Sequence, residues 1–123
     1  MKKVSILIPA YNEQESLPLL YDKLTEVVGG LPQYEWEFMF VNDGSRDRTL
    51  EMLQELRVKD KRVNYVDLSR NFGKEVAMLA GFDYVSGDCV VIMDADLQHP
   101  PHMIATFLEK WEEGYEDVYA VRK

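Results

Sequence analysis

The sequence of 123 residues is long enough for one domain with a single core. Hydrophobic residues make up 46% of it and charged residues 29%, which excludes intrinsic disorder as a description of the whole chain. A net charge of −8 disfavours general binding to nucleic acids or anionic lipid headgroups, and the one cysteine, Cys89, excludes an internal disulfide and a cysteine-cluster zinc site.

Short β-branched or aromatic runs alternate along the chain with segments of helical spacing. The runs predict strands at residues 4–8, 36–41, 63–68, 89–93 and 117–121. Ser16 is the expected N-cap of the first helix, with Pro18 in its first turn. The apolar positions expected to form helix faces are, in chain order, Leu17, Leu20, Leu24 and Val27; Leu50, Leu53 and Leu56; Val76, Leu79, Ala80 and Tyr84; and Ile104, Phe107, Leu108 and Trp111.

This alternation indicates βαβ units and an α/β fold: a Rossmann-like, mostly parallel sheet with helices on both faces. No repeat or linker divides the chain, so residues 1–123 form a single predicted domain. Because the chain stops at residue 123, in or just after the fifth predicted strand, we expect it to be a fragment of a longer protein. No apolar run approaches the roughly 20 residues of a membrane-spanning helix, so we expect a soluble, cytoplasmic domain.

Polar residues follow each of the first four predicted strands. Ligands of open parallel sheets bind outside the carboxyl ends of the strands, so these residues predict one site. Asp94 and Asp96 are separated by one residue, and together they can face a hard cation such as Mg²⁺ or Mn²⁺. Gln98 can add a neutral oxygen, whereas His99 is expected to be a polar loop residue rather than a ligand.

The first two strand ends carry groups suited to a nucleoside. Asp43 can accept the ring N–H of a uracil or guanine, and Gly44 permits close backbone approach. Tyr11 can stack on a base, and Glu13 can hold a ribose hydroxyl. The alternatives are structural: turn chemistry for Asp43 and Gly44, and a helix-start signature for Tyr11 and Glu13.

Two cations, Arg70 and Lys74, follow the third predicted strand. Near an acidic site they can bind phosphate, and the alternative is a solvated basic pair.

Four segments together resemble the family 2 glycosyltransferases: VSILIPAYNE at residues 4–13, VNDGS at residues 41–45, LSRNFGKE at residues 68–75 and MDADLQHPP at residues 93–101. The likeness is greatest to the polyprenyl-phosphate sugar transferases, the branch that includes bactoprenol glucosyltransferases and dolichol-phosphate mannose synthases. It covers essentially the whole chain. The resemblance implies a GT-A fold, of which this chain would be the N-terminal, nucleotide-sugar-binding part.

The resemblance also implies roles for individual residues. It puts Pro9, Tyr11, Glu13 and Asp43 at nucleoside contacts, and it puts Asp94, Asp96 and Gln98 at metal and diphosphate positions. Combined with the cations above, the expected nucleotide-sugar-binding residues are Pro9, Tyr11, Glu13, Asp43, Arg70, Lys74, Asp94 and Ala95. The expected metal ligands are Asp94, Asp96 and Gln98, and the expected catalytic residue is Asp96.

The expected reaction is inverting transfer of a sugar from a nucleotide-sugar, with UDP favoured over GDP, to a polyprenyl phosphate with the help of Mg²⁺ or Mn²⁺. The full-length enzyme is expected at the cytoplasmic face of the membrane, and this chain alone is expected to bind the donor without turnover. An uncovered edge at the fifth predicted strand favours a homo-oligomer.

Two other classes of protein fit the sequence less well. A receiver-type signalling domain needs two adjacent acids after the first strand and a lone aspartate after the third, which this sequence lacks. A nucleotidyltransferase needs a Gly-rich phosphate loop, which is also absent from the sequence.

Overall fold

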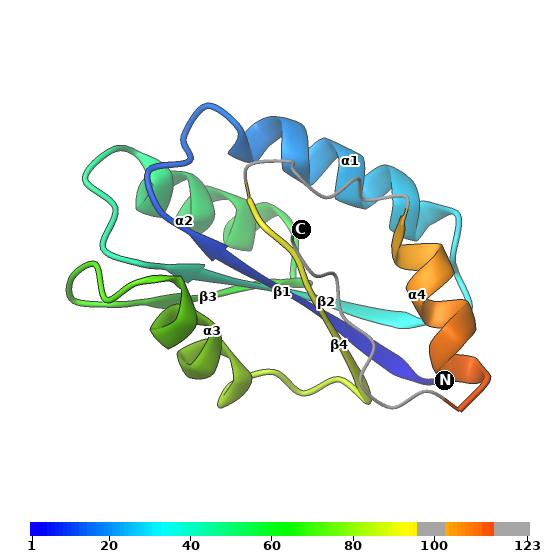
Figure 1. Cartoon of the computed structure of the whole chain (residues 1–123). Coiled ribbons are helices and arrows are strands. Elements are labelled where there is room, and N and C mark those ends of the chain that lie inside the picture. Colours follow the sequence, from blue (N-terminus) through cyan, green and yellow to red (C-terminus); the bar gives the residue numbers. More distant parts are fainter. Residues whose placement is uncertain (96–102, 115–123) are drawn as a thin grey trace.

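The computed structural model describes residues 1–95 and 103–114, which form alternating strands and helices (Figure 1). The elements are β1 (Lys3–Ala10), α1 (Leu17–Gly29), β2 (Glu35–Asn42), α2 (Thr49–Lys59), β3 (Val63–Asp67), α3 (Lys74–Phe82), β4 (Cys89–Ile92) and α4 (Met103–Glu112). The predicted α/β alternation is confirmed for all of these elements. The strand expected at residues 117–121 lies outside the described residues.

The described strands form one parallel sheet in the order β3-β2-β1-β4. β1 pairs with β2 from Lys3 to Ala10, but β4 pairs with the other side of β1 only from Val4 to Leu7. The order 3-2-1-4 is that of a Rossmann sheet, whereas receiver domains have the order 2-1-3-4-5. The topology therefore contradicts the receiver-type alternative and confirms the Rossmann-like expectation.

The larger part of the core lies between the sheet and the helices α1, α2 and α4, on the side opposite α3 (Figure 1). Alternate residues of β1 and β2, such as Ile6 and Phe38, point to this side and are fully buried. Each such side chain stabilises the fold by roughly 1.5–3 kcal/mol. The helices contribute Leu17, Leu20, Leu24, Val28, Leu53, Ile104 and Leu108.

α1 starts at the predicted position, but its N-cap residue does not make a capping hydrogen bond. Ser16 is the N-cap and Pro18 lies in the first turn, as predicted. The Ser16 hydroxyl makes no capping hydrogen bond and instead donates to the Glu13 side chain at 3.0 Å. At the other end of the helix Val28 is buried, and Val27 packs against the core while partly exposed.

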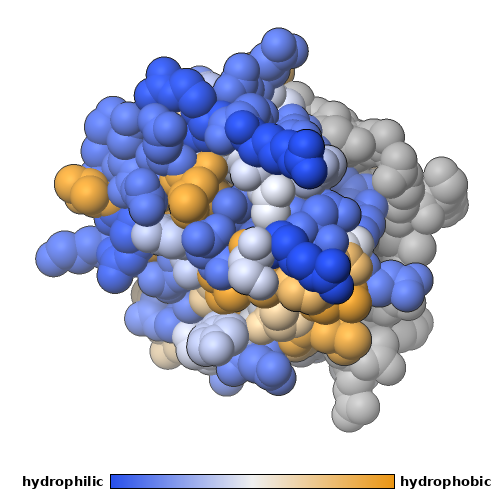
Figure 2. Space-filling model, turned by 90° about the vertical axis from the view of Figure 1, so that its left-hand side faces the viewer, coloured by the Kyte–Doolittle hydropathy of each residue, from blue (hydrophilic) through white to orange (hydrophobic). Residues whose placement is uncertain are grey.

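The face predicted for α3 is wrong. Val76 and Leu79 are exposed, Ala80 is half-buried, and Tyr84 is exposed beyond the end of the helix. The residues that α3 buries against the sheet are Ala77 and Gly81. Small residues bring this helix so close to the strands that larger side chains no longer fit beneath it. The large apolar residues therefore point outward, and a hydrophobic area is visible in Figure 2 at the level where α3 lies in Figure 1.

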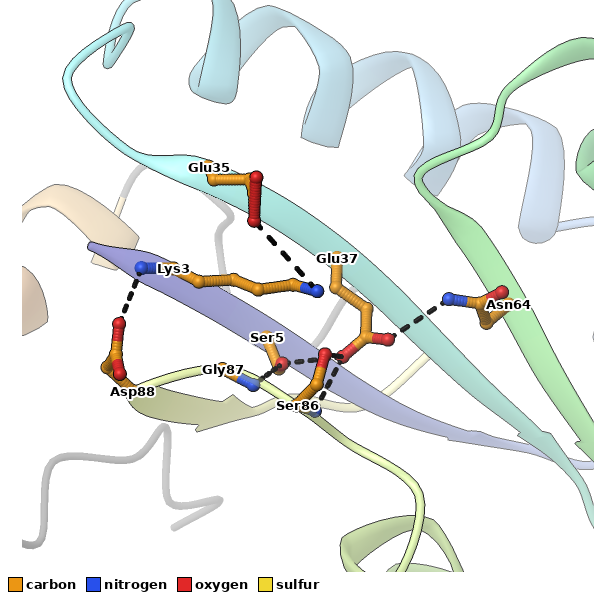
Figure 3. Close-up of polar contacts among 8 residues, drawn as sticks. All are labelled: Lys3, Ser5, Glu35, Glu37, Asn64, Ser86, Gly87 and Asp88. Atoms are coloured by element: carbon orange, nitrogen blue, oxygen red, sulfur yellow. Dashed lines mark hydrogen bonds and ion pairs between the residues drawn. The ribbon is translucent and has the colours of Figure 1, made fainter. Parts of the chain in front are cut away.

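A buried polar cluster lies beneath the α3–β4 connection, towards the amino ends of the strands (Figure 3). Glu37 of β2 is 6% exposed, and its Oε1 accepts hydrogen bonds from Oγ of Ser5 at 2.7 Å and from N–H of Ser86 at 3.0 Å. Its Oε2 accepts from Nδ2 of Asn64 at 3.0 Å, and N–H of Gly87 donates to Oγ of Ser5 at 2.9 Å. The cluster thus joins three strands and fixes the chain as it enters β4.

The last described helix is fastened to the first residues of the chain. Nζ of Lys2 donates to Glu112 at 2.8 Å and lies 5.0 Å from the ring centroid of Trp111. Trp111 in turn packs against Tyr34, with ring centroids 6.4 Å apart. In residues 1–95 and 103–114, no helix is both long and apolar enough to cross a membrane.

Candidate functional site

The polar strand ends meet at one edge of the sheet, which faces the viewer in Figure 2, and they enclose a pocket of about 240 Å³. The pocket lies where the strand order reverses, with β2 and β3 on one side of β1 and β4 on the other. Open parallel sheets leave a crevice at such a point. The residues that line it are Pro9, Ala10, Tyr11, Glu13, Asp43, Asn71, Gly73, Lys74, Asp94 and Ala95.

Pro9 lies where β1 and β4 part. The carbonyl of Leu7 accepts a hydrogen bond from N–H of Met93 at 3.1 Å, so the backbone N–H and C=O groups of Leu7 point towards β4. The backbone groups of every second residue in a strand point to the same neighbouring strand. The next residue whose backbone points towards β4 is Pro9, which has no N–H to donate. Pairing between β1 and β4 ends at Leu7, and beyond it Asp94 and Ala95 line the pocket.

Asp43 follows β2 directly and holds the loop that precedes α3. Its carboxylate, 3% exposed, accepts N–H of Phe72 at 2.8 Å, N–H of Gly73 at 3.1 Å and Nδ2 of Asn71 at 3.1 Å. The Asn71 amide also donates to the backbone carbonyl of Asp43 at 3.1 Å. A carboxylate has about four acceptor sites, so Asp43 retains capacity for one further donor in the pocket.

Gly44 allows this loop to lie against the end of β2. Its φ is +69°, a conformation that favours glycine, and an added Cβ would lie 2.8 Å from Cα of Arg70. The close approach that the structure shows at Gly44 is that of the chain's own loop, and the predicted approach of its backbone to a ligand stays a prediction.

The segment that carries Tyr11 and Glu13 is locked to the loop after β2. Asn12 adopts a positive φ of 53°, its N–H donates to Oγ of Ser45 at 2.9 Å, and its Oδ1 accepts N–H of Arg46 at 2.7 Å. These bonds on both sides of Asn12 hold Tyr11 at the pocket wall, where its side chain is 42% exposed.

A second set of hydrogen bonds joins the same two loops, those after β1 and β2. N–H of Gln14 donates to Asp47 at 3.2 Å, and the Gln14 side chain accepts N–H of Arg48 at 3.0 Å. Burial disfavours the ionised form of Asp47, but hydrogen bonds from Thr49 and from Gln14 outweigh burial and hold the pKa of Asp47 below its ordinary value. The two loops therefore form one rigid unit beside the pocket.

Asp94 and Lys74 form an ion pair across the pocket, between Nζ of Lys74 and Oδ1 of Asp94. Asp94 lies two residues beyond β4 and is 6% exposed, whereas the Lys74 side chain, at the first position of α3, is 42% exposed. A nearly buried carboxylate and an accessible ammonium thus face the same space.

Most of the predicted site residues that the structure describes lie together in this pocket. Arg70 is not among its lining residues, because its guanidinium lies over the ring of Phe72, 4.7 Å from the centroid. Asp96, Gln98 and His99 lie outside the described residues. The predicted residues that line the pocket are Pro9, Tyr11, Glu13, Asp43, Lys74, Asp94 and Ala95.

Among the residues that shape the pocket, sequence reasoning missed Asn12, Asn71 and Gly73. Asn71 and Gly73 line it, and Asn12 joins the two loops beside it. All three lie inside the segments that resemble the family, and none of them carries a charge. Asparagine tolerates positive φ and bonds the backbone locally, and this property was the available signal.

The described residues provide one of the three predicted metal ligands. Within residues 1–95 and 103–114, no group of three or more His, Cys, Asp or Glu side chains could hold a metal ion. The Asp94 carboxylate does present oxygen to the pocket, and oxygen ligands suit Mg²⁺ or Mn²⁺. The described part of the site therefore fits a hard cation through Asp94, and Asp96 and Gln98 stay predictions.

Two solved structures illustrate the similarity in fold. The mannosyltransferase PcManGT from Pyrobaculum calidifontis, in complex with GDP-Man and Mn²⁺, matches 88% of this chain with a TM-score of 0.74 at 22% identity. The glucosyl-3-phosphoglycerate synthase of Mycobacterium tuberculosis, with Mn²⁺, UDP and glucosyl-3-phosphoglycerate, matches 89% with a TM-score of 0.61 at 24% identity. This chain covers 32% and 39% of them, and the likeness establishes the α/β fold expected of GT-A enzymes.

Curated relatives are more similar in sequence. The uncharacterized glycosyltransferase YkcC of Bacillus subtilis is 49% identical over 96% of this chain, and the bactoprenol glucosyl transferase of Shigella phage SfV is 42% identical over 98%. The chain spans only 36% and 39% of the lengths of these two relatives. The model of glycosyl transferase family 2 matches residues 5–123, so the chain belongs to glycosyl transferase family 2.

Proposed function

We propose that the pocket binds the nucleotide-sugar donor, a UDP-sugar in preference to a GDP-sugar, of an inverting transfer to a polyprenyl phosphate. One observation carries the proposal: groups from all four described strand ends, which suit a base, a ribose and a diphosphate, converge on one pocket where β1 and β4 part.

The pocket has a nucleoside end and a diphosphate end in this proposal. Tyr11 offers an exposed ring for stacking on the base, and Asp43 offers its remaining acceptor site to a ring N–H. Glu13, which lines the same wall, takes a ribose hydroxyl. Lys74 and Asp94 stand at the diphosphate end, where their opposite charges suit phosphate and metal respectively.

Charge on the leaving diphosphate is the main chemical demand of the transfer. Mg²⁺ or Mn²⁺, held by Asp94, Asp96 and Gln98, would neutralise that charge as a Lewis acid. Lys74 adds a second positive charge on the same side. A lipid phosphate is already ionised at neutral pH, so it attacks the anomeric carbon in line without a strong general base, and one displacement inverts that carbon.

The acceptor belongs to the longer protein in this proposal. Several relatives are named bactoprenol glucosyl transferase, and they match this chain at 42% identity over 98% of its length. Because the chain spans 38–39% of those relatives, we assign the acceptor site and its position at the cytoplasmic membrane face to the remaining part.

Titration calorimetry with a panel of nucleotides tests the donor site. We expect UDP and UDP-sugars to bind in the presence of Mn²⁺, GDP more weakly, and both to lose most of their affinity when Mn²⁺ is chelated. Asp94→Asn should weaken Mn²⁺-dependent UDP binding by tenfold or more, and Asp96→Asn should have a similar effect.

The matched control is Asp22→Asn, at an exposed position of α1 away from the pocket, which should leave UDP affinity unchanged. Unchanged UDP affinity in Asp94→Asn with Mn²⁺ present would contradict the assignment. Thermal unfolding of each variant shows whether a loss of binding reflects a loss of fold.

A further inference from the structure

Within the part of the chain that the structure describes, the Lys74–Asp94 pair joins two groups to which the proposed function gives different ligands. Asp94 is assigned to the metal, and Lys74 is assigned to the diphosphate. In the structure each meets the other instead, across a pocket open to solvent. A cation at Oδ1 of Asp94 would therefore compete with the ammonium of Lys74 for the same oxygen.

We infer that Lys74 is an exchangeable counter-ion of Asp94, which makes the divalent cation and the nucleoside diphosphate bind as a unit. The inference rests on the proposed function and concerns the order and coupling of binding. A cation that enters alone must displace an ammonium from a carboxylate that is 6% exposed. The diphosphate gives the displaced Lys74 a new partner, so the exchange is favourable only when both ligands are present.

The surroundings of the pair restrict where Lys74 can go. Within the pocket, the carboxylate of Asp43 already accepts three hydrogen bonds from the loop at Asn71, Phe72 and Gly73, and the proposed function gives its remaining acceptor site to the base. The Glu13 carboxylate accepts the hydroxyl of Ser16 at 3.0 Å. An anion brought in by the ligand is therefore the natural second partner for the ammonium.

The two side chains also differ in mobility in the way that an exchange requires. Lys74 has a long flexible stem, is 42% exposed and begins α3, whereas the side chain of Asp94 is 9% exposed. Leaving a buried carboxylate without a cation is costly, and the contact with Lys74 lowers that cost. The mobile partner is thus the one that exchanges, and the metal ligand stays in place.

Coupling of this kind is measured by binding Mn²⁺ in the absence and presence of UDP, followed by the electron paramagnetic resonance signal of free Mn²⁺. For the unaltered chain we expect UDP to raise Mn²⁺ affinity strongly. Lys74→Met, which keeps the stem and removes the charge, should bind Mn²⁺ alone about fivefold or more tightly than the unaltered chain. In the same variant UDP should raise Mn²⁺ affinity much less.

Lys74→Arg keeps the positive charge and should stay close to the unaltered chain in Mn²⁺ affinity without UDP. Lys23→Met, at an exposed position of α1, controls for the loss of a positive charge elsewhere on the surface. Because linkage is reciprocal, calorimetry of UDP with and without Mn²⁺ should give the same coupling factor for each protein. Thermal unfolding without ligands checks that all variants are folded.

The two proposals fail in different ways. If the unaltered chain binds UDP with Mn²⁺ but Lys74→Met binds Mn²⁺ alone no more tightly, the counter-ion inference is overturned and the donor site stands. If neither protein binds Mn²⁺ alone or with UDP, the metal assignment of Asp94 is overturned together with the inference. If Lys74→Met gains Mn²⁺ affinity while no nucleotide binds either protein, the counter-ion role of Lys74 is supported and the proposed donor is wrong.

Discussion

Asp43 has two roles in the proposed site, and ligands of different size can separate them. Its carboxylate holds the loop at Phe72 and Gly73, and we assign its remaining acceptor site to the base. We expect Asp43→Ala to lower the free energy of unfolding by about 1–3 kcal/mol, because the loop donors lose their acceptor. Urea denaturation measures this loss.

The same variant should lose more affinity for UDP with Mn²⁺ than for pyrophosphate with Mn²⁺, since only UDP carries a base. Equal losses for the two ligands would mean that Asp43 acts solely as the anchor of the loop. Asn71→Ala is the comparison variant, because it removes one bond to the Asp43 carboxylate and leaves that carboxylate in place.

Gly81 shows how one residue brings α3 close to the sheet. An added Cβ would overlap Cδ1 of Leu7 and lie 2.9 Å from Cγ2 of Val41. We expect Gly81→Ala to destabilise the fold by about 1–3 kcal/mol through overpacking. Gly29→Ala is the control, because nothing lies within 4 Å of its added Cβ, and it should be neutral or stabilising. A stable Gly81→Ala would mean that α3 shifts outward freely.

At the level of elements, the strands were predictable and the face of α3 was not. Buried parallel strands are apolar almost throughout, so runs such as residues 36–41 identify them directly. In α3 the usual rule that large apolar residues face the core fails, because Ala77 and Gly81 pack there while Leu79 is 67% exposed. The close contact between α3 and the sheet requires small residues, and small residues do not stand out as hydrophobic in the sequence.

The residues of the candidate site also divide into those that the sequence could place and those that it could not. Acidic residues at strand ends, such as Asp43 and Asp94, could be placed in the pocket because parallel strands bring their carboxyl ends to one edge. The positions of Arg70 and Asn71 could not, because they depend on how the β3–α3 loop folds over Gly44. A charge in a loop predicts a function only when the path of the backbone is known.

The hydrogen bonds of Glu37 connect β1, β2, β3 and the α3–β4 connection, and their contribution to stability depends on pH. Burial of the Glu37 carboxyl raises its pKa, but hydrogen bonds from Ser5, Ser86 and Asn64 and the charge of Lys3 outweigh burial, so its pKa lies below the ordinary 4.5. A lowered pKa means that the ionised form stabilises the folded state above pH 4.5, and that this contribution is lost as the pH falls through the folded-state pKa.

We therefore expect the free energy of unfolding to decrease between about pH 5 and pH 3, and to decrease less steeply in Glu37→Gln than in the unaltered chain. Urea denaturation at a series of pH values measures both slopes. Glu26→Gln, at an exposed position of α1, is the matched control and should keep the original slope. Equal slopes for Glu37→Gln and the unaltered chain would contradict the role of Glu37.

Across the whole molecule, the sheet is unevenly paired around β1. β1 pairs with β2 along its full length from Lys3 to Ala10, but with β4 only from Val4 to Leu7. We expect amides of β4 to exchange hydrogen for deuterium faster than those of β2, since fewer ladder bonds must open. Peptide-resolved exchange measured by mass spectrometry tests this difference.

Addition of UDP with Mn²⁺ should slow exchange in β4 more than in β3, because Asp94 lies two residues beyond β4 and is an assigned metal ligand. Exchange in β4 slower than in β2 without ligand would contradict the expected difference in stability. The same spectra report on α2, which serves as an internal reference away from Asp94.

The hydrogen bonds between the loop after β1 and the loop after β2 bear on how donor preference can change. Asn12 and Gln14 exchange hydrogen bonds with residues 45–48, so we expect each loop to change shape when the other is replaced. A chimera that takes only residues 11–16 from a relative with another nucleotide preference should lose donor affinity altogether. Transplanting both loops together should transfer the preference. Substitutions that change donor preference are therefore expected to occur in both loops together.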